Sequence, residues 1–383
     1  MTRIVSGLLA VVSLAGSALA APAQPVSLQE AISRLGDFDY DVRTQASSLI
    51  RRAPVDEARE ALVSAVATHE DGYVRYRALV LLVGFGGVAA RDTVFDTLGD
   101  ENDRLRAVAY GYFAHNPDSA VVPRLLQALD AETSEFVRPA LIRALASHDD
   151  DAAVRARLLA DIDRGVDFFR GAVIEALGDR GATYAVERLS AVAAQPGPLQ
   201  DDALLALTRI GDSRALPTVA ALQGADPELE PMVSAAAAAF GTDRDAHFAF
   251  VVDTLRYAAS AGDQRDLVRS AAAGLGALAA TGDERALAVL FDIAAGAPTA
   301  EREAIALVLG TIAMRHPDAV LAHLETRGDL ADAALVLRDG FDMLDEDLEE
   351  ERFFMTARRT FWDAPEGSST RRVSDELIRV LEF

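Results

Sequence analysis

The chain has 383 residues and a formal net charge of −23; half of its residues are hydrophobic, although only 6% are aromatic. So acidic a surface repels the phosphates of nucleic acids and the headgroups of anionic membranes, which argues against a binder of either kind. The sequence contains neither cysteine nor lysine, which excludes disulfides, thiolate chemistry, lipid attachment through cysteine and lysine-based catalysis.

Residues 1–20 have the pattern of a secretory signal peptide. Arg3 precedes an apolar run from Ile4 to Ala15, and Ala18-Leu19-Ala20 forms a small-x-small cleavage site. The apolar run is too short to span a membrane. We therefore expect a mature chain that begins at Ala21, is periplasmic or secreted, and is not inserted in the membrane.

An apolar residue followed by arginine recurs through the first half of the chain. The pairs are Val42-Arg43, Val74-Arg75, Leu105-Arg106, Val137-Arg138 and Phe169-Arg170. Their spacings are 32, 31, 32 and 32 residues. A constant period of this length indicates an array of helix pairs, each of which buries its apolar face only against its neighbours. The pattern weakens at Leu199-Gln200 and Met232-Val233 and returns at Val268-Arg269, so residues 242–265 should hold an extra turn or a longer loop.

Capping residues place the ends of the helices. A good N-cap stands three residues before the apolar member of the first four pairs, namely at Asp39, Asp71, Asn102 and Ser134. Glycine followed by aspartate, as in Gly178-Asp179, Gly211-Asp212 and Gly282-Asp283, predicts a left-handed helix stop followed by the cap of the next helix.

These features resemble a known family. The Asp-x-x-Val-Arg motif, the helix start Ala215-Leu216-Pro217 and the junction Leu177-Gly178-Asp179 are similar to short bacterial HEAT-like repeats, including those of phycobilisome lyases, over roughly residues 27–328. The resemblance implies an all-α fold, a right-handed α-solenoid of about ten helix pairs whose second helices line the concave face. The expected domains are a signal peptide (1–20), the solenoid (21–328) and an acidic C-terminal helical cap (329–383).

No group of residues in the sequence predicts catalysis, a cofactor or a metal. His69-Glu70 is the one His-Glu dyad, whereas the HEAT-repeat iron enzyme deoxyhypusine hydroxylase has several, so the chain departs from that enzyme. The run His148-Asp149-Asp150-Asp151 and the acidic stretch Asp342–Arg352 lack the glycine turn and alternating ligands of a calcium loop. We interpret them as a solvated turn and a solvated helix face.

The repeating arginines have two interpretations, a site for an anionic ligand or a ladder of Arg–carboxylate pairs between stacked repeats. We favour the structural ladder, because the planar guanidinium suits bidentate pairing with an acid of a neighbouring repeat. The arginines in question are Arg43, Arg75, Arg106, Arg138, Arg170 and Arg269.

A second periodic set lies one residue before the apolar-Arg pairs and consists of Tyr73, Arg104, Phe136 and Phe168. These residues should follow one edge of the concave surface. They either pack in the seams between repeats, the interpretation we favour, or form a binding strip for an extended peptide.

The sequence therefore predicts a non-enzymatic binding scaffold of the cell envelope, which recognises a protein or peptide on its concave face. A lyase-type HEAT protein or another enzyme accessory factor is an alternative. A structural spacer without a specific ligand is another.

Overall fold

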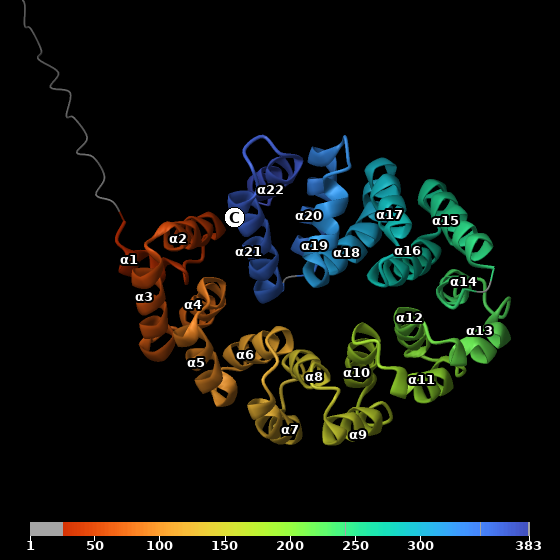
Figure 1. Cartoon of the computed structure of the whole chain (residues 1–383), viewed down its shortest axis with the longest axis horizontal. Helices are drawn as coiled ribbons and strands as arrows, with labels where there is room; N and C mark the ends of the chain where they lie inside the picture. The colour runs from red at the N-terminus through yellow and green to blue at the C-terminus, as the bar shows by residue number, and fades with distance from the viewer. Residues whose placement is uncertain (1–25, 242, 345, 382–383) are drawn as a thin grey trace, which may run out of the picture.

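The computed structural model describes residues 26–241, 243–344 and 346–381, and this part of the chain is helical with no strand. The predicted signal peptide and the start at Ala21 lie outside the described residues. Helices follow one another in pairs, joined by short turns, and successive pairs stack side by side (Figure 1). The fold is an α-solenoid, as predicted.

Odd-numbered helices are the first members of the pairs: α1 (Leu28–Arg34), α3 (Val55–Thr68), α5 (Val88–Asp96), α7 (Val122–Ala131), α9 (Ala152–Asp161), α11 (Val186–Ala193), α13 (Leu216–Leu222), α15 (Arg244–Ala261), α17 (Glu284–Gly296) and α19 (Pro317–Leu324). Even-numbered helices are the second members: α2 (Tyr40–Arg52), α4 (Gly72–Phe85), α6 (Asp103–His115), α8 (Arg138–Ala146), α10 (Asp167–Asp179), α12 (Gln200–Ile210), α14 (Glu230–Ala239), α16 (Arg265–Ala280), α18 (Thr299–Arg315) and α20 (Leu330–Leu344). Short 3₁₀ turns precede or follow some of them: η1 (Thr97–Gly99), η2 (Ser119–Val121), η3 (Thr183–Ala185) and η4 (Ser213–Ala215). Two further helices, α21 (Asp347–Asp363) and α22 (Ser369–Val380), end the described chain.

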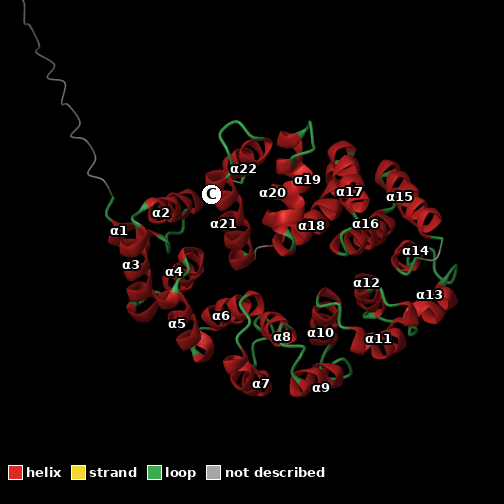
Figure 2. Cartoon of the chain, viewed as in Figure 1, coloured by secondary structure: helices red, strands yellow, loops and turns green. Residues whose placement is uncertain are grey.

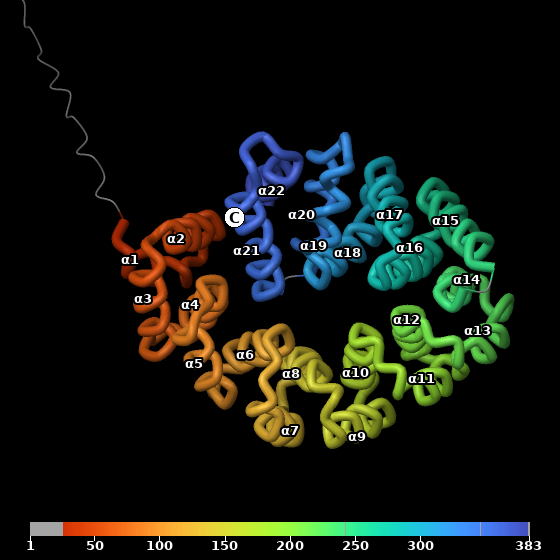
Figure 3. Tube along the Cα trace, in the orientation of Figure 1, coloured from red at the N-terminus to blue at the C-terminus, as the bar shows by residue number. Residues whose placement is uncertain are grey.

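The solenoid curves until its two ends meet. Figure 1 shows α3, α5, α7 and α9 on the outer side of the arc and α4, α6, α8 and α10 on the inner side. The tube in Figure 3 follows the chain round the arc and back, so that α21 lies beside α2 and α4. The molecule is therefore a nearly closed ring, in which α21 occupies part of the inner face.

Three of the four predicted caps are present, and the fourth differs for a physical reason. The side chains of Asp39, Asp71 and Asn102 accept hydrogen bonds from backbone N–H groups in the first turns of α2, α4 and α6. Ser134 does not cap α8, which begins only at Arg138. A helix capped by Ser134 would have Pro139 as its fifth residue, where the missing N–H leaves the Glu135 carbonyl without its helical partner. In the helix that begins at Arg138, Pro139 lies in the first turn, where no such bond is needed.

Of the predicted glycine stops, two hold and one is wrong. Gly211 and Gly282 have φ of 67° and 92°, the left-handed region that ends a helix. Gly178 instead lies inside α10, where a Cβ would come within 2.7 Å of the Ala206 Cα. Its role is to let α10 and α12 approach closely, and the left-handed residue of this turn is Gly181.

The buried residues form two apolar clusters, one from Ala31 to Ala237 and the other from Ala235 to Leu381. Leu348 of α21 belongs to the first cluster although it is distant from it in sequence. The irregular spacing predicted near residues 242–265 corresponds to a longer helix, since α15 has 18 residues.

Within the described ranges, no single helix is long and apolar enough to cross a membrane. Of the helices described, only α18 and α19 together have sufficient length and apolar character, and they are bent by 114° where they join. Figure 2 shows α18 placed among the other helices of the arc. It packs there between α16 and α20.

Candidate partner-binding surfaces

The first turns of the inner helices are held in register by hydrogen bonds that cross from one repeat to the next. Asn102 Nδ2 donates to the Gly72 carbonyl at 3.0 Å, and Ser134 Oγ lies 3.0 Å from Asp103 Oδ2. Residues at equivalent positions in these turns therefore follow one edge of the ring. We call Tyr73, Arg104, Phe136 and Phe168 on this edge the aromatic rim.

The first two rim residues are in contact with each other. The Arg104 guanidinium carbon lies 5.8 Å from the ring centroid of Tyr73 and 5.5 Å from that of Tyr76. Tyr73 is half-buried, and Arg104 is exposed. Cation–π attraction thus holds an arginine on the surface with its planar face supported by two rings.

Phe136 and Phe168 face solvent, with 66% and 62% of their surface exposed. The seam position expected for them is filled by the next aromatic residue, Phe169, which is 5% exposed and lies 5.0 Å from the Arg138 guanidinium. The seam interpretation is therefore wrong for both Phe136 and Phe168. Exposed large apolar side chains at equivalent positions of successive repeats make this edge a candidate contact surface.

Sequence reasoning missed rim residues at the ends of the strip. Phe38 and Tyr40 at the start of α2, and Val166 before α10, are exposed large side chains near the same turns. Their positions do not continue the steps of 31 or 32 residues that separate Tyr73, Arg104, Phe136 and Phe168, so the repeat spacing does not predict them. The signal that would find them is an aromatic or β-branched residue at an N-cap or next to one: Phe38 and Tyr40 flank the cap Asp39, and Val166 is the N-cap residue of α10.

Two of the six repeating arginines form the expected pairs between repeats. Arg75 Nη2 lies 2.5 Å from Asp100 Oδ2, and Arg106 binds both carboxylate oxygens of Glu132 at 2.9 and 2.8 Å. In each case the acid ends the first helix of the following pair or lies just beyond it. These two arginines tie adjacent repeats together.

The other four arginines do not reach an acid of the next repeat. Arg43 and Arg170 donate to backbone carbonyls of the turn before their own helix, and Arg138 donates twice to the Glu132 carbonyl. Arg269 is exposed and lies 3.4 Å from Asp266 one turn earlier. Arg75 and Arg106 also donate to carbonyls of their own repeat, those of Val66 and Asp100. Five of the six arginines therefore close the turn inside a repeat, where unpaired carbonyls at the end of a helix are near acceptors.

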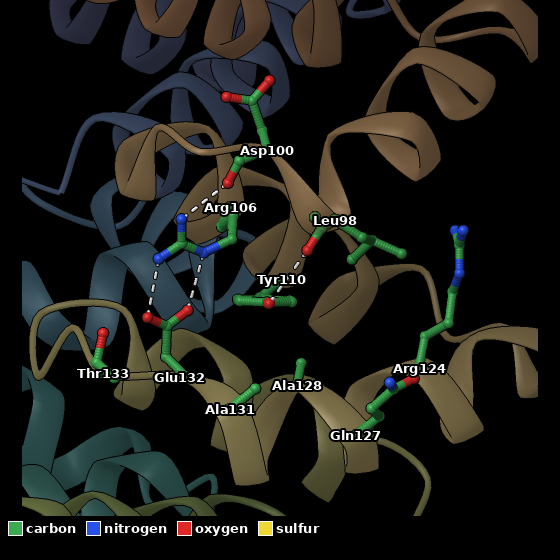
Figure 4. Close-up of a pocket in the computed structure, with 11 residues that line it drawn as sticks. Leu98, Asp100, Arg106, Tyr110, Arg124, Gln127, Ala128, Ala131, Glu132 and Thr133 are labelled. Atoms are coloured by element: carbon green, nitrogen blue, oxygen red, sulfur yellow. Dashed lines mark hydrogen bonds and ion pairs between the residues drawn. The ribbon is translucent and has the colours of Figure 1, made fainter.

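A cavity of about 400 Å³ lies between η1, α6 and α7 (Figure 4). Arg106 and Glu132 close one side of it, and the Tyr110 hydroxyl donates to the Leu98 carbonyl at 3.2 Å. Burial raises the pKa of Tyr110 to about 12. Since Arg106 is bound to Glu132 and to the Asp100 carbonyl, its charge is already satisfied, and the cavity has the character of a packing gap.

The inner face of the first four pairs is covered by α21 through ion pairs with four successive inner helices. Arg51 of α2 pairs with Glu351, and Arg77 of α4 with Asp347. His115 Nε2 of α6 lies 2.8 Å from Glu349 Oε1, and Arg143 of α8 lies 3.8 Å from Glu346. The acidic stretch predicted to be a solvated helix face is therefore in large part an internal contact.

The Glu349 carboxylate is a strongly stabilised charge of this contact. It is buried, which by itself raises its pKa, but a hydrogen bond from His115 and the charges of His115, Arg352 and Arg143 lower the pKa to about 2. Arg352 donates to the second oxygen at 2.6 Å. Glu349 therefore stays ionised through the whole physiological range.

A second contact crosses the ring between α10 and α18. Arg315 lies 2.7 Å from Glu175 and 2.5 Å from Asp179, and Arg209 of α12 lies 3.1 Å from the same aspartate. Burial raises the pKa of Glu175, but the charges of Arg315 and Arg209 outweigh it and lower the pKa. Two cavities of about 350 and 190 Å³ share Glu175, Asp179 and Arg315, so paired charges lie in their partly apolar walls.

Metal ligation finds no support in the described part of the chain, where no three His, Asp or Glu side chains come together around a common point. Asp151 caps α9 by accepting from two backbone N–H groups, and Arg155 binds the Asp149 carbonyl. Burial lowers the pKa of His148, although the neighbouring aspartates work to raise it. The His148–Asp151 run is a helix start.

Paired helices, repeating caps and cross-repeat bonds define the described part of the chain as an α-solenoid. Residues 28–112, from α1 into α6, match the family model described as HEAT repeats. No curated protein matches the sequence. A solved structure, the complex of CpcE and CpcF of phycocyanin lyase from Nostoc sp. PCC7120, is similar with 19% identity and a TM-score of 0.31, over 85% of this chain and 97% of that chain.

Proposed function

We propose that the protein is a non-enzymatic binding scaffold of the cell envelope, and that it holds a protein partner along the aromatic rim. HEAT repeats indicate a protein-interaction scaffold in general. The observation that supports this particular surface is the exposure of Phe136 and Phe168 in successive repeats, next to the Arg104–Tyr73 stack. Aromatic and arginine side chains carry most of the binding energy at protein interfaces.

The charge around the rim favours a basic or neutral partner in an extended conformation. Asp71, Glu101, Glu135 and Asp167 are exposed carboxylates in the same turns as the aromatic residues. Arginine or lysine of a partner can lie over an aromatic ring and pair with a neighbouring carboxylate at once. Helices pack about 10 Å apart, so four repeats in register offer a strip of roughly 30 Å, the length of about nine extended residues.

The proposed location follows from the secretory pattern of residues 1–20 and from the absence of cysteine, which argues against a lipoprotein. N-terminal sequencing of the protein from the envelope fraction tests it. We expect a mature chain that begins at Ala21. An intact Met1 on a cytoplasmic protein would contradict the proposal.

The rim is tested by substituting Phe136→Ala and Phe168→Ala together and capturing partners from an envelope extract. Tyr257→Ala is the matched control, because Tyr257 is also 62% exposed but lies on α15, away from the rim. We expect the double variant to lose proteins that the wild type and the control both retain. Equal capture by all three would show that the rim is not the binding surface.

The same capture separates the two alternatives. A structural spacer predicts that no protein is specifically retained by any of the three. A lyase-type accessory factor predicts that a pigment or a pigment-carrying protein is retained, which visible absorbance of the captured fraction detects.

A further inference from the structure

The inner face of the first four repeats carries a row of three arginines and one histidine in a strongly acidic protein. Arg51, Arg77, His115 and Arg143 project from α2, α4, α6 and α8, one from each inner helix, against a net charge of −23 for the whole chain. All four meet acids of α21 or of the residue just before it. These side chains are thus placed to match the acidic face of one helix that crosses them.

The same face is also shaped for a helix. A Cβ on Gly84 would lie 2.7 Å from Glu351 Oε1, and a Cβ on Gly111 would lie 2.5 Å from Leu348 Cδ2. Both glycines are inside helices, where alanine would be more favourable by about 1 kcal/mol. The missing side chains leave the groove in which Leu348 and Glu351 are seated.

The contact of α21 with this face is mainly polar. Leu348 is its apolar member in the cluster of the N-terminal repeats, whereas Phe353 and Phe354 belong to the cluster of the C-terminal repeats. Phe354 also meets the inner face through the Arg51 guanidinium, whose carbon lies 5.5 Å from its ring centroid. A contact made of charge pairs and one leucine resembles the polar interfaces between domains that move relative to one another. It does not resemble a permanent apolar core. The helix can therefore leave the groove while its other side keeps its packing.

We propose that the inner face of α2, α4, α6 and α8 is a receptor groove for an acidic amphipathic helix of a partner protein, with α21 as its resident intramolecular occupant. The occupant defines the ligand: carboxylates on one face of a helix, with a leucine between them that enters at Gly111. This groove takes a partner of opposite charge to the one proposed for the aromatic rim. Tyr76 takes part in both sites, because its ring supports Arg104 and its hydroxyl donates to Asp347 of α21. Peptide binding tests the groove without Phe136 or Phe168, and protein capture tests the rim, so failure of one proposal is distinguished from failure of the other.

A labelled peptide tests the groove in the full mature chain. The probe is a synthetic, fluorophore-labelled copy of residues 346–363, and its binding is followed by fluorescence anisotropy. In the wild type, tethered α21 competes at an effective concentration in the millimolar range, so binding of the peptide should be weak. In the variant Asp347→Asn/Glu351→Gln, which weakens α21 and keeps the groove intact, we expect at least tenfold tighter binding.

A second variant blocks the groove from the other side. We call Asp347→Asn/Glu351→Gln the opened variant. Gly111→Leu, added to it, fills the space that the Leu348 side chain occupies and should abolish peptide binding. Gly296→Leu is the matched control, because Gly296 ends α17 and a Cβ there would meet no neighbouring heavy atom within 4 Å. That control should bind the peptide as the opened variant does.

Three results would overturn the proposal. They are absence of binding to the opened variant, binding that Gly111→Leu does not affect, and dimerisation of the opened variant in light scattering, which would assign the groove to a second copy. Far-UV circular dichroism shows whether each variant is folded. If the opened variant does not fold, the exchange Arg77→Asp/Asp347→Arg, which keeps an ion pair between α4 and α21, should fold and leave peptide binding weak. Failure to do so also counts against the groove.

Discussion

At the scale of single residues, arginine has three roles here, and the nearest acceptor decides which. Arg106 reaches a buried carboxylate of the next repeat, Arg138 reaches a backbone carbonyl, and Arg269 projects into solvent. The three positions are equivalent in the repeat. Their contributions to stability should therefore differ, although the sequence pattern treats them alike.

Substitution to alanine measures this difference. Arg106→Ala leaves Glu132, whose side chain is 3% exposed, without its partner, so we expect a loss of about 2–4 kcal/mol in the free energy of unfolding. Arg138→Ala should cost about 1–2 kcal/mol. Arg269→Ala serves as the control and should change stability by less than about 0.5 kcal/mol. Urea titration gives all three values, and equal losses would contradict the assignment.

Neighbouring phenylalanines at the start of α10 give a second test. Phe169 is buried under Arg138, so Phe169→Ala should cost about 3–5 kcal/mol. Phe168→Ala removes an exposed ring, so we expect a change within about 0.5 kcal/mol. Thermal melting by circular dichroism measures both. A large loss for Phe168 would place it in the seam after all.

At the scale of elements, periodic information predicts what is repeated and misses what occurs once. The apolar-Arg period locates the second helices of the pairs, and the caps at Asp39, Asp71 and Asn102 start α2, α4 and α6. Ser134 and Gly178 fail because a proline in one case and a close helix contact in the other override a local rule.

The acidic helix α21 is the clearest example of a feature that the sequence does not predict. Its carboxylates look solvated because their partners lie more than two hundred residues away and follow no sequence pattern of their own. The rim residues are predicted by register, but their exposure is not, since periodicity gives a position along a helix and not the depth of packing. The sequence therefore predicts the helix pairs of the fold in detail. For the aromatic rim it predicts which positions repeat, but not how exposed the side chains are.

Glu349 in α21 gives a prediction about pH. Its pKa is about 2 in the folded protein and near 4.5 in an unfolded chain, so it contributes stability above pH 4.5 that is lost as the pH falls toward 2. The contribution is on the order of 3 kcal/mol. Glu349→Gln should therefore be less stable than wild type at pH 7, with the gap closing between pH 4.5 and 2. Urea titrations at pH 7, 4 and 3 measure the gap, and a constant difference would contradict this role.

At the scale of the whole molecule, the ring is closed by charge. The ends of the solenoid meet through α21 and the first four inner helices, and Arg315 adds a contact across the interior with Glu175 and Asp179. This closure places α21 against the inner face of the first repeats (Figure 1), while Phe136 and Phe168 of the rim stay exposed. Both proposed surfaces depend on it, because the rim binds outside the closed ring and the groove is available when α21 leaves.

The distance between the two ends measures closure directly. The chain has no cysteine, so Gln45→Cys on α2 and Arg359→Cys on α21, both at exposed positions, carry spin labels without interference. Pulsed electron–electron double resonance on the otherwise wild-type chain should give one narrow distribution of the distance between the two spin labels. With Asp347→Asn/Glu351→Gln added, the distribution should become broader and longer. A broad distribution in the wild type, or one that these substitutions leave unchanged, would contradict closure by the α21 ion pairs.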